Sequence, residues 1–323
     1  MTPSVTIGLT SHRIESLPFA RRLMEHHDVI ILEEAPNRMF IDMLDMKISI
    51  NDYIREEGME FPEFSRCYYT LLRKFYREGK QILLVEPYME HLMQIYEMFT
   101  DGKEPSYIMN IPAMSEVYDA ERKETAALLY FYESSLKDPF PEVVDAVKKF
   151  ARADAERFRM RDAMRAEAIS KALADNKRIY VEAGAIHIYL VKVLRDLVKK
   201  RFHIKTEYLL EPLFRKLIGK KEVLVPGDLL TIHYILHKKN DEEYETLQAA
   251  RSIIFIKLLY KEEMIPSRRE KAPHVKDRIA VNKLVCKLTF AQCEELYKKI
   301  RFQGRRQALE TLQIYRQKLP SPV

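Results

Sequence analysis

The sequence predicts an α/β protein with a central, mostly parallel sheet, flanking helices and a mainly helical C-terminal extension. Three short apolar runs, residues 29–34 (VIILEE), 82–86 (ILLVE) and 179–187 (IYVEAGAIH), have the length and composition of buried strands. Stretches with helical spacing separate these runs. The first strand–helix–strand unit takes about thirty residues, which is the size of one parallel crossover.

The predicted sheet region extends from residue 4 to residue 209. Residues 4–10 (SVTIGLT) are the first strand, and Ser16 and Pro18 favour the start of a helix over residues 19–27. The second strand covers 29–33, and helical periodicity follows over 37–76. Pro87 ends a third strand at 81–85. We then expect a helix at 89–99, a loop at 102–112, long helices at 116–135 and 142–173, a strand at 179–181, a helix at 185–199 and a strand at 203–209.

The character of the chain changes near residue 212. Beyond it, helical patterns cover residues 229–237, 245–260, 275–287 and 290–319. Residues 1–200 contain 29 basic and 33 acidic residues, whereas residues 201–323 contain 25 basic and 15 acidic residues. We therefore predict an α/β domain over residues 1–212 and a basic, mainly helical subdomain over residues 213–323.

Composition also bears on location and partners. No apolar run approaches the roughly 20 residues that span a bilayer, and residues 1–10 lack a signal-peptide pattern. Cys67, Cys286 and Cys293 have no paired metal-ligand spacing, so we expect reduced thiols in a cytoplasmic protein. The basic run over residues 298–306 could bind phosphate backbones, but a solvated helix face is the commoner source of such a pattern, and we do not expect nucleic acid binding. The oligomeric state is left open.

Acidic side chains stand where three predicted strands end. Glu33, Glu86 and Glu182 occupy these ends, and His187 follows shortly after the third. Ligands of open α/β sheets bind beyond the carboxyl ends of the strands, so these groups could share one pocket. Imidazole and carboxylate ligands suit Zn, Mn, Fe or Co, and a bound ion would acidify water. Without metal, His187 near Glu33 could activate water as a general base.

Each of these residues also has a simpler interpretation. A chain turns polar when it leaves the core, and a single histidine near a helix start is more often a packing or capping residue. Arg161 could bind a substrate carboxylate or phosphate, or form a salt bridge on a charged helix. Gly184, between a strand and a helix, permits close approach of the backbone. If the strand is still extended at Glu33 and Glu34, only one of them faces the pocket, and we expect Glu33.

Two blocks of the sequence resemble the TraB/PrgY/GumN-like family. In residues 7–38 a strand leads to His12, and a second strand ends at Glu33 before Pro36 and Arg38. The second block, residues 159–187, contains the matching Arg161, Asp162, Gly184 and His187. The resemblance covers residues 5–200. The first motif, Gly8-Leu-Thr-Ser-His12, has one residue more than the Gly-x-x-His of the family.

The resemblance implies a hydrolase or peptidase in which a His/Glu cluster activates water, with or without a divalent metal. The wider superfamily includes Tiki proteins, erythromycin esterases and ChaN-like proteins. The substrate would be a small molecule or a peptide. The alternative is a non-catalytic protein of the same fold that binds a ligand, haem or a metal. The candidate residues are Glu33, His187, His12 and Arg161 for catalysis, Arg38, Glu86 and Gly184 for substrate binding, and His12, Glu33 and His187 for a metal.

Overall fold

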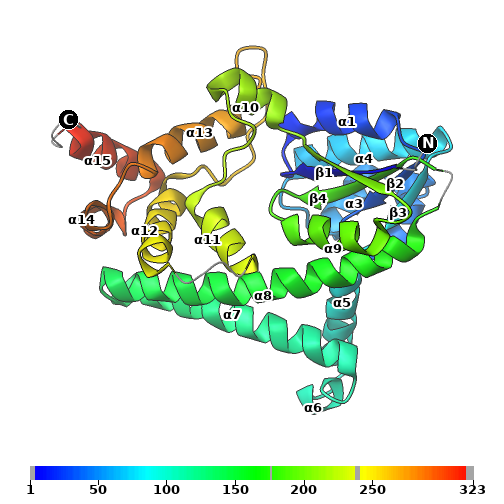
Figure 1. Ribbon diagram of the computed structural model, residues 1–323, viewed down its shortest axis with the longest axis horizontal. Helices are drawn as coiled ribbons and strands as arrows, with labels where there is room; N and C mark the ends of the chain where they lie inside the picture. The colour runs from blue at the N-terminus through cyan, green and yellow to red at the C-terminus, as the bar shows by residue number, and fades with distance from the viewer. Residues whose placement is uncertain (1–3, 175–176, 237–240, 318–323) are drawn as a thin grey trace. The chain divides into compact units, whose positions relative to one another are not determined.

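A five-stranded parallel sheet is the centre of the fold, as the sequence predicts. The computed structural model describes residues 4–174, 177–236 and 241–317. The strand order is β3-β2-β4-β1-β5, and every neighbouring pair is parallel (Figure 1). The strands are β1 (Ser4–Thr10), β2 (Val29–Leu32), β3 (Gln81–Leu84), β4 (Ile179–Gly184) and β5 (His203–Tyr208).

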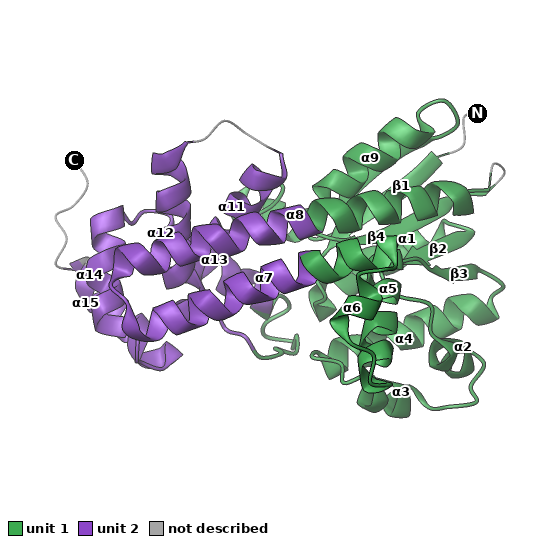
Figure 2. Cartoon of the chain, turned by 90° about the horizontal axis from the view of Figure 1, so that it is seen from below, with its two compact units in different colours: residues 1–119, 158–222, 262–273 green, residues 120–157, 223–261, 274–323 purple. Residues whose placement is uncertain are grey.

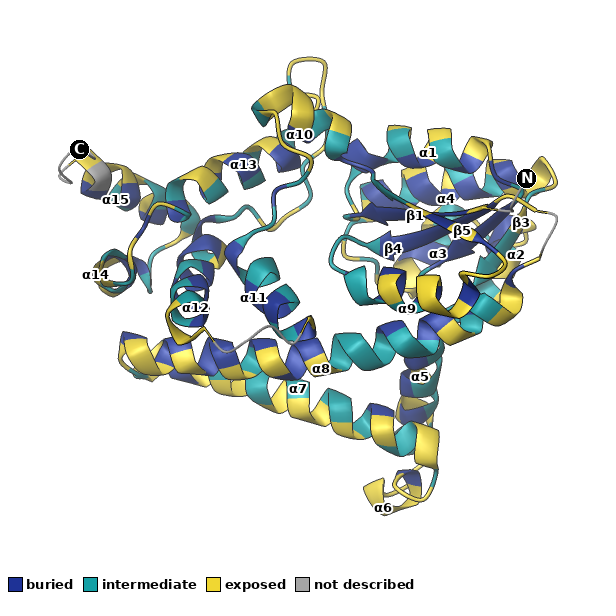
Figure 3. Cartoon of the chain, in the orientation of Figure 1, coloured by how far each residue is buried: buried dark blue, intermediate teal, exposed yellow. Residues whose placement is uncertain are grey.

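The sheet is apolar on both faces because helices cover both (Figure 3). One core joins Ile7 and Val181 of the sheet to the long helix α8 and to helix α9. The other joins Ile30 and Tyr180 to the helices α1 to α4. The helices of these two layers are α1 (Leu17–Glu25), α2 (Arg38–Leu44), α3 (Ile50–Glu56), α4 (Pro62–Arg77), α8 (Phe140–Ala172) and α9 (Ile188–Val198).

Glycine at position 8 permits this packing. Gly8 lies opposite Glu182 in the register of β1 and β4. A Cβ atom at this position would collide with the aromatic ring and hydroxyl of Tyr180. The ring of Tyr180 therefore lies directly against the backbone of β1 at Gly8, and its side chain is fully buried.

The chain forms two compact units, coloured separately in Figure 2. Unit 1 comprises residues 1–119, 158–222 and 262–273, and unit 2 comprises residues 120–157, 223–261 and 274–323. These units do not coincide with the two domains predicted on either side of residue 212. The boundaries instead cross the helices α7 (Pro112–Lys137) and α8, and the segment 262–273 returns to unit 1.

Unit 1 contains the sheet, and unit 2 is helical. Unit 1 also includes α5 (Pro87–Thr100), α6 (Pro105–Ile108), α10 (Glu211–Ile218) and the 3-10 helix η1 (Ile14–Ser16). The core of unit 2 includes Val143, Leu230, Ile254 and Leu296. Its remaining helices are α11 (Pro226–Ile235), α12 (Glu242–Leu258), α13 (Pro273–Val285), α14 (Phe290–Ile300) and α15 (Arg305–Gln317).

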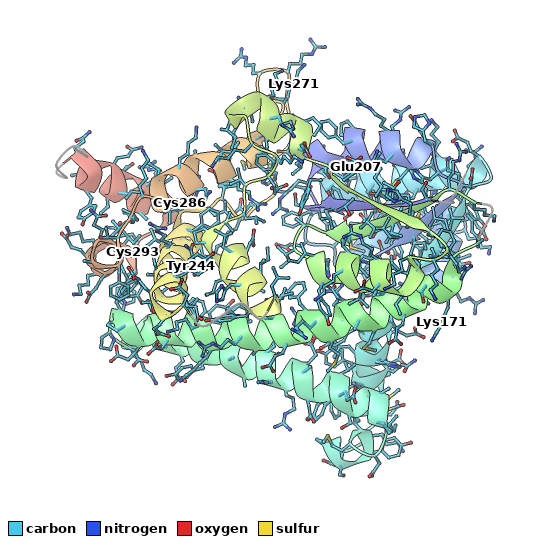
Figure 4. All side chains as sticks on the ribbon, in the orientation of Figure 1. Lys171, Glu207, Tyr244, Lys271, Cys286 and Cys293 are labelled. Carbon is cyan, nitrogen blue, oxygen red and sulfur yellow. The ribbon has the colours of Figure 1, made fainter. Side chains whose placement is uncertain are left out.

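Some predicted elements differ from the observed ones. The predicted loop at 102–112 contains the short helix α6, which Pro105 begins. The predicted helix at 290–319 is two helices, α14 and α15, separated around Gly304. Cys286 directly follows the last residue of α13, whereas Cys293 lies in α14 (Figure 4). His237 and Leu319, at the ends of two predicted helices, lie outside the described residues.

None of the helices in the described part of the chain combines the length and the apolar character needed to cross a membrane.

Candidate functional site

The candidate site lies where β3, β2 and β4 end side by side. Glu33 follows the last residue of β2, Glu86 lies two residues after β3, and Glu182 lies near the end of β4. The backbone N–H of Val85 donates to Leu32, so β3 remains beside β2 up to this edge. The parallel sheet thus brings three glutamates from distant parts of the sequence to one edge.

Glu33 is the centre of a buried polar network. Its Oε1 atom lies 2.9 Å from Nε2 of His187 and accepts a hydrogen bond of 2.9 Å from Arg161. Its Oε2 atom accepts a 2.7 Å hydrogen bond from the backbone N–H of Gly184 and lies 3.4 Å from Nη1 of Arg165. Burial alone would raise the pKa of Glu33, but His187 and Arg165 outweigh it and hold this pKa well below its usual value.

Gly184 is required by the close approach of these groups. A Cβ atom there would lie 2.9 Å from Cδ2 of His187 and 3.8 Å from Oε2 of Glu33. A larger residue would therefore push the imidazole away from the end of β4. Glycine lets the Glu33 carboxylate reach the backbone and the imidazole together.

His187 is oriented by a second carboxylate. Nδ1 of His187 pairs with Oδ1 of Asp162 on α8, and Oδ2 of Asp162 accepts a 2.9 Å hydrogen bond from the backbone N–H of Leu190. Asp162 thus fixes both the imidazole and the first turn of α9. Burial opposes the charged imidazole, but Glu33 and Asp162 raise the pKa of His187 to about 9.

Two arginines one turn apart on α8 surround Glu33 and Glu86. Arg161 lies 3.2 Å from Oε1 of Glu86 through its Nε atom, in addition to its contact with Glu33. Arg165 is fully buried and donates hydrogen bonds to the carbonyls of Val85 (2.9 Å) and Glu182 (2.7 Å). Burial raises the pKa of Glu86 although both arginines oppose the rise.

The network opens onto a pocket of about 440 Å³. Glu33 and Arg161 are part of its wall, whereas His187 lies behind Glu33. Glu34 lines the pocket as well, because β2 ends at Leu32 and the chain bends at residues 33 and 34. The strand is therefore no longer extended at these two residues, and Glu34 faces the pocket together with the expected Glu33. The lining also includes His12, Tyr53, Met59, Phe61, Phe64, Tyr68, Tyr69, Met89 and Glu182.

Helix α4 supplies much of the aromatic wall. Pro62 stands at its start, and the carboxylate of Glu263 accepts hydrogen bonds from the backbone N–H groups of Glu63 (3.0 Å) and Phe64 (2.7 Å). From this anchored helix, Tyr68 donates a 2.6 Å hydrogen bond to Oε2 of Glu182.

Glu34 and Glu182 have environments opposite to that of Glu33. Tyr69 donates a 3.3 Å hydrogen bond to Glu34. Burial, and then repulsion by Glu182, raise the pKa of Glu34 to about 8. Burial also raises the pKa of Glu182, and the neighbouring His12 opposes that rise. Adjacent glutamates in one pocket thus favour different protonation states.

The structure brings together most of the predicted site residues. Glu33, Glu86, Arg161, Gly184 and His187 are in one network. His12 lies in the pocket wall, where its ring stacks on Phe64 with the centroids 5.4 Å apart. Arg38 is exposed at the first position of α2 and does not line the pocket.

The donor set does not fit a divalent ion held by His12, Glu33 and His187. Both ring nitrogens of His187 face carboxylates, and two guanidinium groups already neutralise Glu33. The described residues contain no group of three or more His, Cys, Asp or Glu side chains placed to hold a metal ion. The chemistry derived below therefore uses the side chains alone.

Several residues of the site were not among the candidates. Arg165 carries a recognisable signal, since it stands four residues after Arg161 and so on the same face of a helix. Asp162 matches the family motif, but its contact with His187 depends on how α8 packs against the start of α9. Tyr68 and Tyr69 carry no signal in the sequence, because aromatic residues at helical spacing equally indicate a core.

Comparisons with known proteins identify a relative of unknown role. The chain is 32% identical over 288 residues to an uncharacterized protein of Archaeoglobus fulgidus, covering 89% of this chain and 96% of that protein. No family model matches the sequence, and no solved structure matches it.

Proposed function

This chain belongs to the same family as the Archaeoglobus fulgidus protein, and we propose that it is a hydrolase of the TraB/Tiki/erythromycin esterase-like type in which Glu33 and His187 activate water. The observation that carries the proposal is the sequence of contacts from Asp162 through His187 to Glu33, which ends at an open pocket. A base held by an oriented second group is the recurring arrangement of general-base catalysis.

Glu33 has the position required of the base. It is 8% exposed, it lines the pocket, and its depressed pKa keeps it ionised throughout the neutral range. A water molecule bound to this carboxylate can attack a carbonyl carbon of the substrate. Glu33 accepts the proton as the new C–O bond forms, and it returns the proton to the leaving group when the scissile bond breaks.

Arg161 supplies the complementary positive charge. It lines the pocket and contacts Glu33 in the resting state. When negative charge develops on the substrate oxygen, the guanidinium group can shift its hydrogen bonds towards that oxygen. The hold of Arg161 on Glu33 then weakens, so the carboxylate becomes more basic at the moment when it must accept a proton.

Glu33→Gln tests the proposal. With a panel of p-nitrophenyl esters, p-nitrophenyl phosphate and aminoacyl anilides, we expect the wild-type protein to hydrolyse at least one compound. The substitution keeps the size of the side chain but removes the base, so kcat/KM should fall by about 10²-fold or more. Because no metal is assigned to the network, EDTA should leave the wild-type rate unchanged.

Glu56→Gln is the matched control, since Glu56 is exposed on α3 and does not line the pocket. Equal rates for wild type and Glu33→Gln on every hydrolysed compound would contradict the proposal. Binding of compounds without any turnover would favour the non-catalytic alternative. Loss of hydrolysis on addition of EDTA would show that the reaction depends on a metal ion.

A further inference from the structure

Two carboxylates of the pocket take no part in the network around Glu33. Glu34 and Glu182 both line the cavity, and Glu182 is only 4% exposed. They lie close enough for Glu182 to disfavour the ionised form of Glu34. Two buried acids that repel each other are costly for a fold unless they serve a purpose.

The two carboxylates are held by neighbouring residues of one helix. Tyr68 and Tyr69 of α4 donate their hydroxyl hydrogens to Glu182 (2.6 Å) and Glu34 (3.3 Å). These hydrogen bonds orient both carboxylates but add no positive charge. The pair is thus positioned before any ligand binds.

The charge of the pocket wall favours a cation. Five of the lining residues are glutamates, whereas Arg161 is the one arginine or lysine among the described lining residues. Arg161 is already engaged with Glu33 and Glu86, and the ring of His12 stacks on Phe64. An anionic ligand would therefore meet net repulsion, and a cation would meet the carboxylates of Glu34 and Glu182.

The remaining wall is apolar and suits an organic body rather than a bare ion. Tyr53, Phe61 and Phe64 supply aromatic surface, and Met59 and Met89 supply flexible apolar surface. The volume of about 440 Å³ lies within the range of small-molecule sites.

We propose that the pocket selects a ligand with a protonated amine on an apolar body, and that the ammonium group binds between Glu34 and Glu182. The inference deepens the proposed function, on which it rests for the identification of this ligand as the substrate. At neutral pH the raised pKa of about 8 keeps Glu34 largely protonated. A bound ammonium group would favour the ionised form of Glu34, because two attractive charge pairs then offset the repulsion between the two carboxylates.

Calorimetric titration with three probes of similar shape tests the inference without any turnover. The probes are 2-phenylethylamine, 2-phenylethanol and phenylacetate, which are cationic, neutral and anionic at pH 7.5. We expect the amine to bind at least tenfold more tightly than the alcohol, and phenylacetate to bind more weakly than both. Glu182→Gln and Glu34→Gln should each weaken amine binding at least tenfold, and Glu56→Gln should leave it unchanged.

Thermal unfolding of the variants shows whether a loss of binding results merely from a loss of folded protein. Removing either member of a repelling pair should leave the protein folded, with a melting temperature equal to or above that of wild type. Equal affinity for amine and alcohol, tighter binding of phenylacetate, or amine binding that survives both substitutions in folded protein would overturn the inference. If hydrolysis depends on Glu33 but is equally fast for substrates with and without an amino group, the inference is overturned and the proposed function remains. Amine binding that depends on Glu34 and Glu182, without hydrolysis of amine-bearing esters, would support the ammonium site and contradict the proposed hydrolase function.

Discussion

At the scale of single residues, two adjacent glutamates of the site differ in how readily they ionise. Glu33 binds a histidine and two arginines and stays ionised, while Glu34 faces a tyrosine and another glutamate and has a pKa of about 8. Their environments differ because the chain bends directly after β2. Both side chains line the pocket, but only Glu33 also contacts His187 and the two arginines. Catalytic sites commonly hold carboxyl groups in such contrasting environments.

The charged state of His187 should make stability depend on pH. Its pKa of about 9 in the folded protein exceeds the value of 6.5 for a free histidine. The group therefore stabilises the fold fully below pH 6.5, and this contribution is lost as the pH rises through 9. Between pH 6 and pH 9.5, the difference in unfolding free energy between wild type and His187→Gln should narrow by about 3 kcal/mol.

Urea unfolding at a series of pH values measures this difference. The control is His203→Gln, because His203 is exposed at the start of β5. Glu34, whose pKa is also raised, makes wild type and both variants less stable as the pH rises from 4.5 to 8, so it cancels in the comparison. A constant difference across the whole range would show that His187 is not held in its charged form.

At the scale of elements, α8 fastens the ends of the strands. Arg165 donates hydrogen bonds to the carbonyl of Val85, just after β3, and to that of Glu182, near the end of β4. Asp162 fixes the start of α9, and Arg161 pairs with the glutamates that follow β2 and β3. These residues lie within two turns of one helix, so a single packing contact between α8 and the sheet positions the whole network.

Arg165→Ala should destabilise the fold strongly. The substitution leaves Glu33 and Glu86 short of a buried positive charge and leaves two buried carbonyls without their hydrogen bonds. Breaking a buried ion pair by removing one partner typically costs about 3–5 kcal/mol. Denaturant unfolding should report a loss of this size, whereas Lys171→Ala, at an exposed position of the same helix, should change stability little. A loss below 1 kcal/mol would mean that Arg165 is not needed to hold the strand ends.

The sequence predicts the strands better than the connections. All five strands are found close to where they are predicted. Three of them, β2, β3 and β4, are short apolar runs bounded by polar residues, which is a pattern typical of buried strands. The break between α14 and α15 and the helix α6 were not predicted, since a single Gly304 or Pro105 does not reveal how the chain turns. In the site, Glu33 and His187 could be predicted from strand ends, but the approach of Tyr68 to Glu182 depends on tertiary packing.

At the scale of the whole molecule, several cations of the basic run over residues 298–306 have local partners. Lys298 and Lys299 pair with Glu294 (2.9 Å) and Glu295 (2.6 Å) along α14. Arg301 donates to the carbonyl of Ser135, and Arg305 pairs with Asp277. Lysine–glutamate ion pairs four residues apart on one helix are typical of a solvated helix face. They favour that interpretation over a phosphate-binding surface.

We therefore expect no salt-dependent retention of the protein on immobilised DNA or polyuridine at 0.15 M salt. A phosphate-binding surface would instead give affinity that falls steeply with salt concentration. The triple variant Lys298→Ala, Lys299→Ala, Arg306→Ala should elute together with wild type. Retention of the wild-type protein that this variant loses would assign a nucleic-acid surface to α14 and α15.

Most of the pocket wall comes from two parts of the chain. The residues around Glu33 come from strand ends and from α8, whereas Tyr53, Phe64 and Tyr68 come from the single segment between β2 and β3. That segment can therefore diverge within the family and alter which molecules the pocket binds, while the network around Glu33 stays the same. Exchanging residues 37–77 between relatives should then change ligand preference without changing that network.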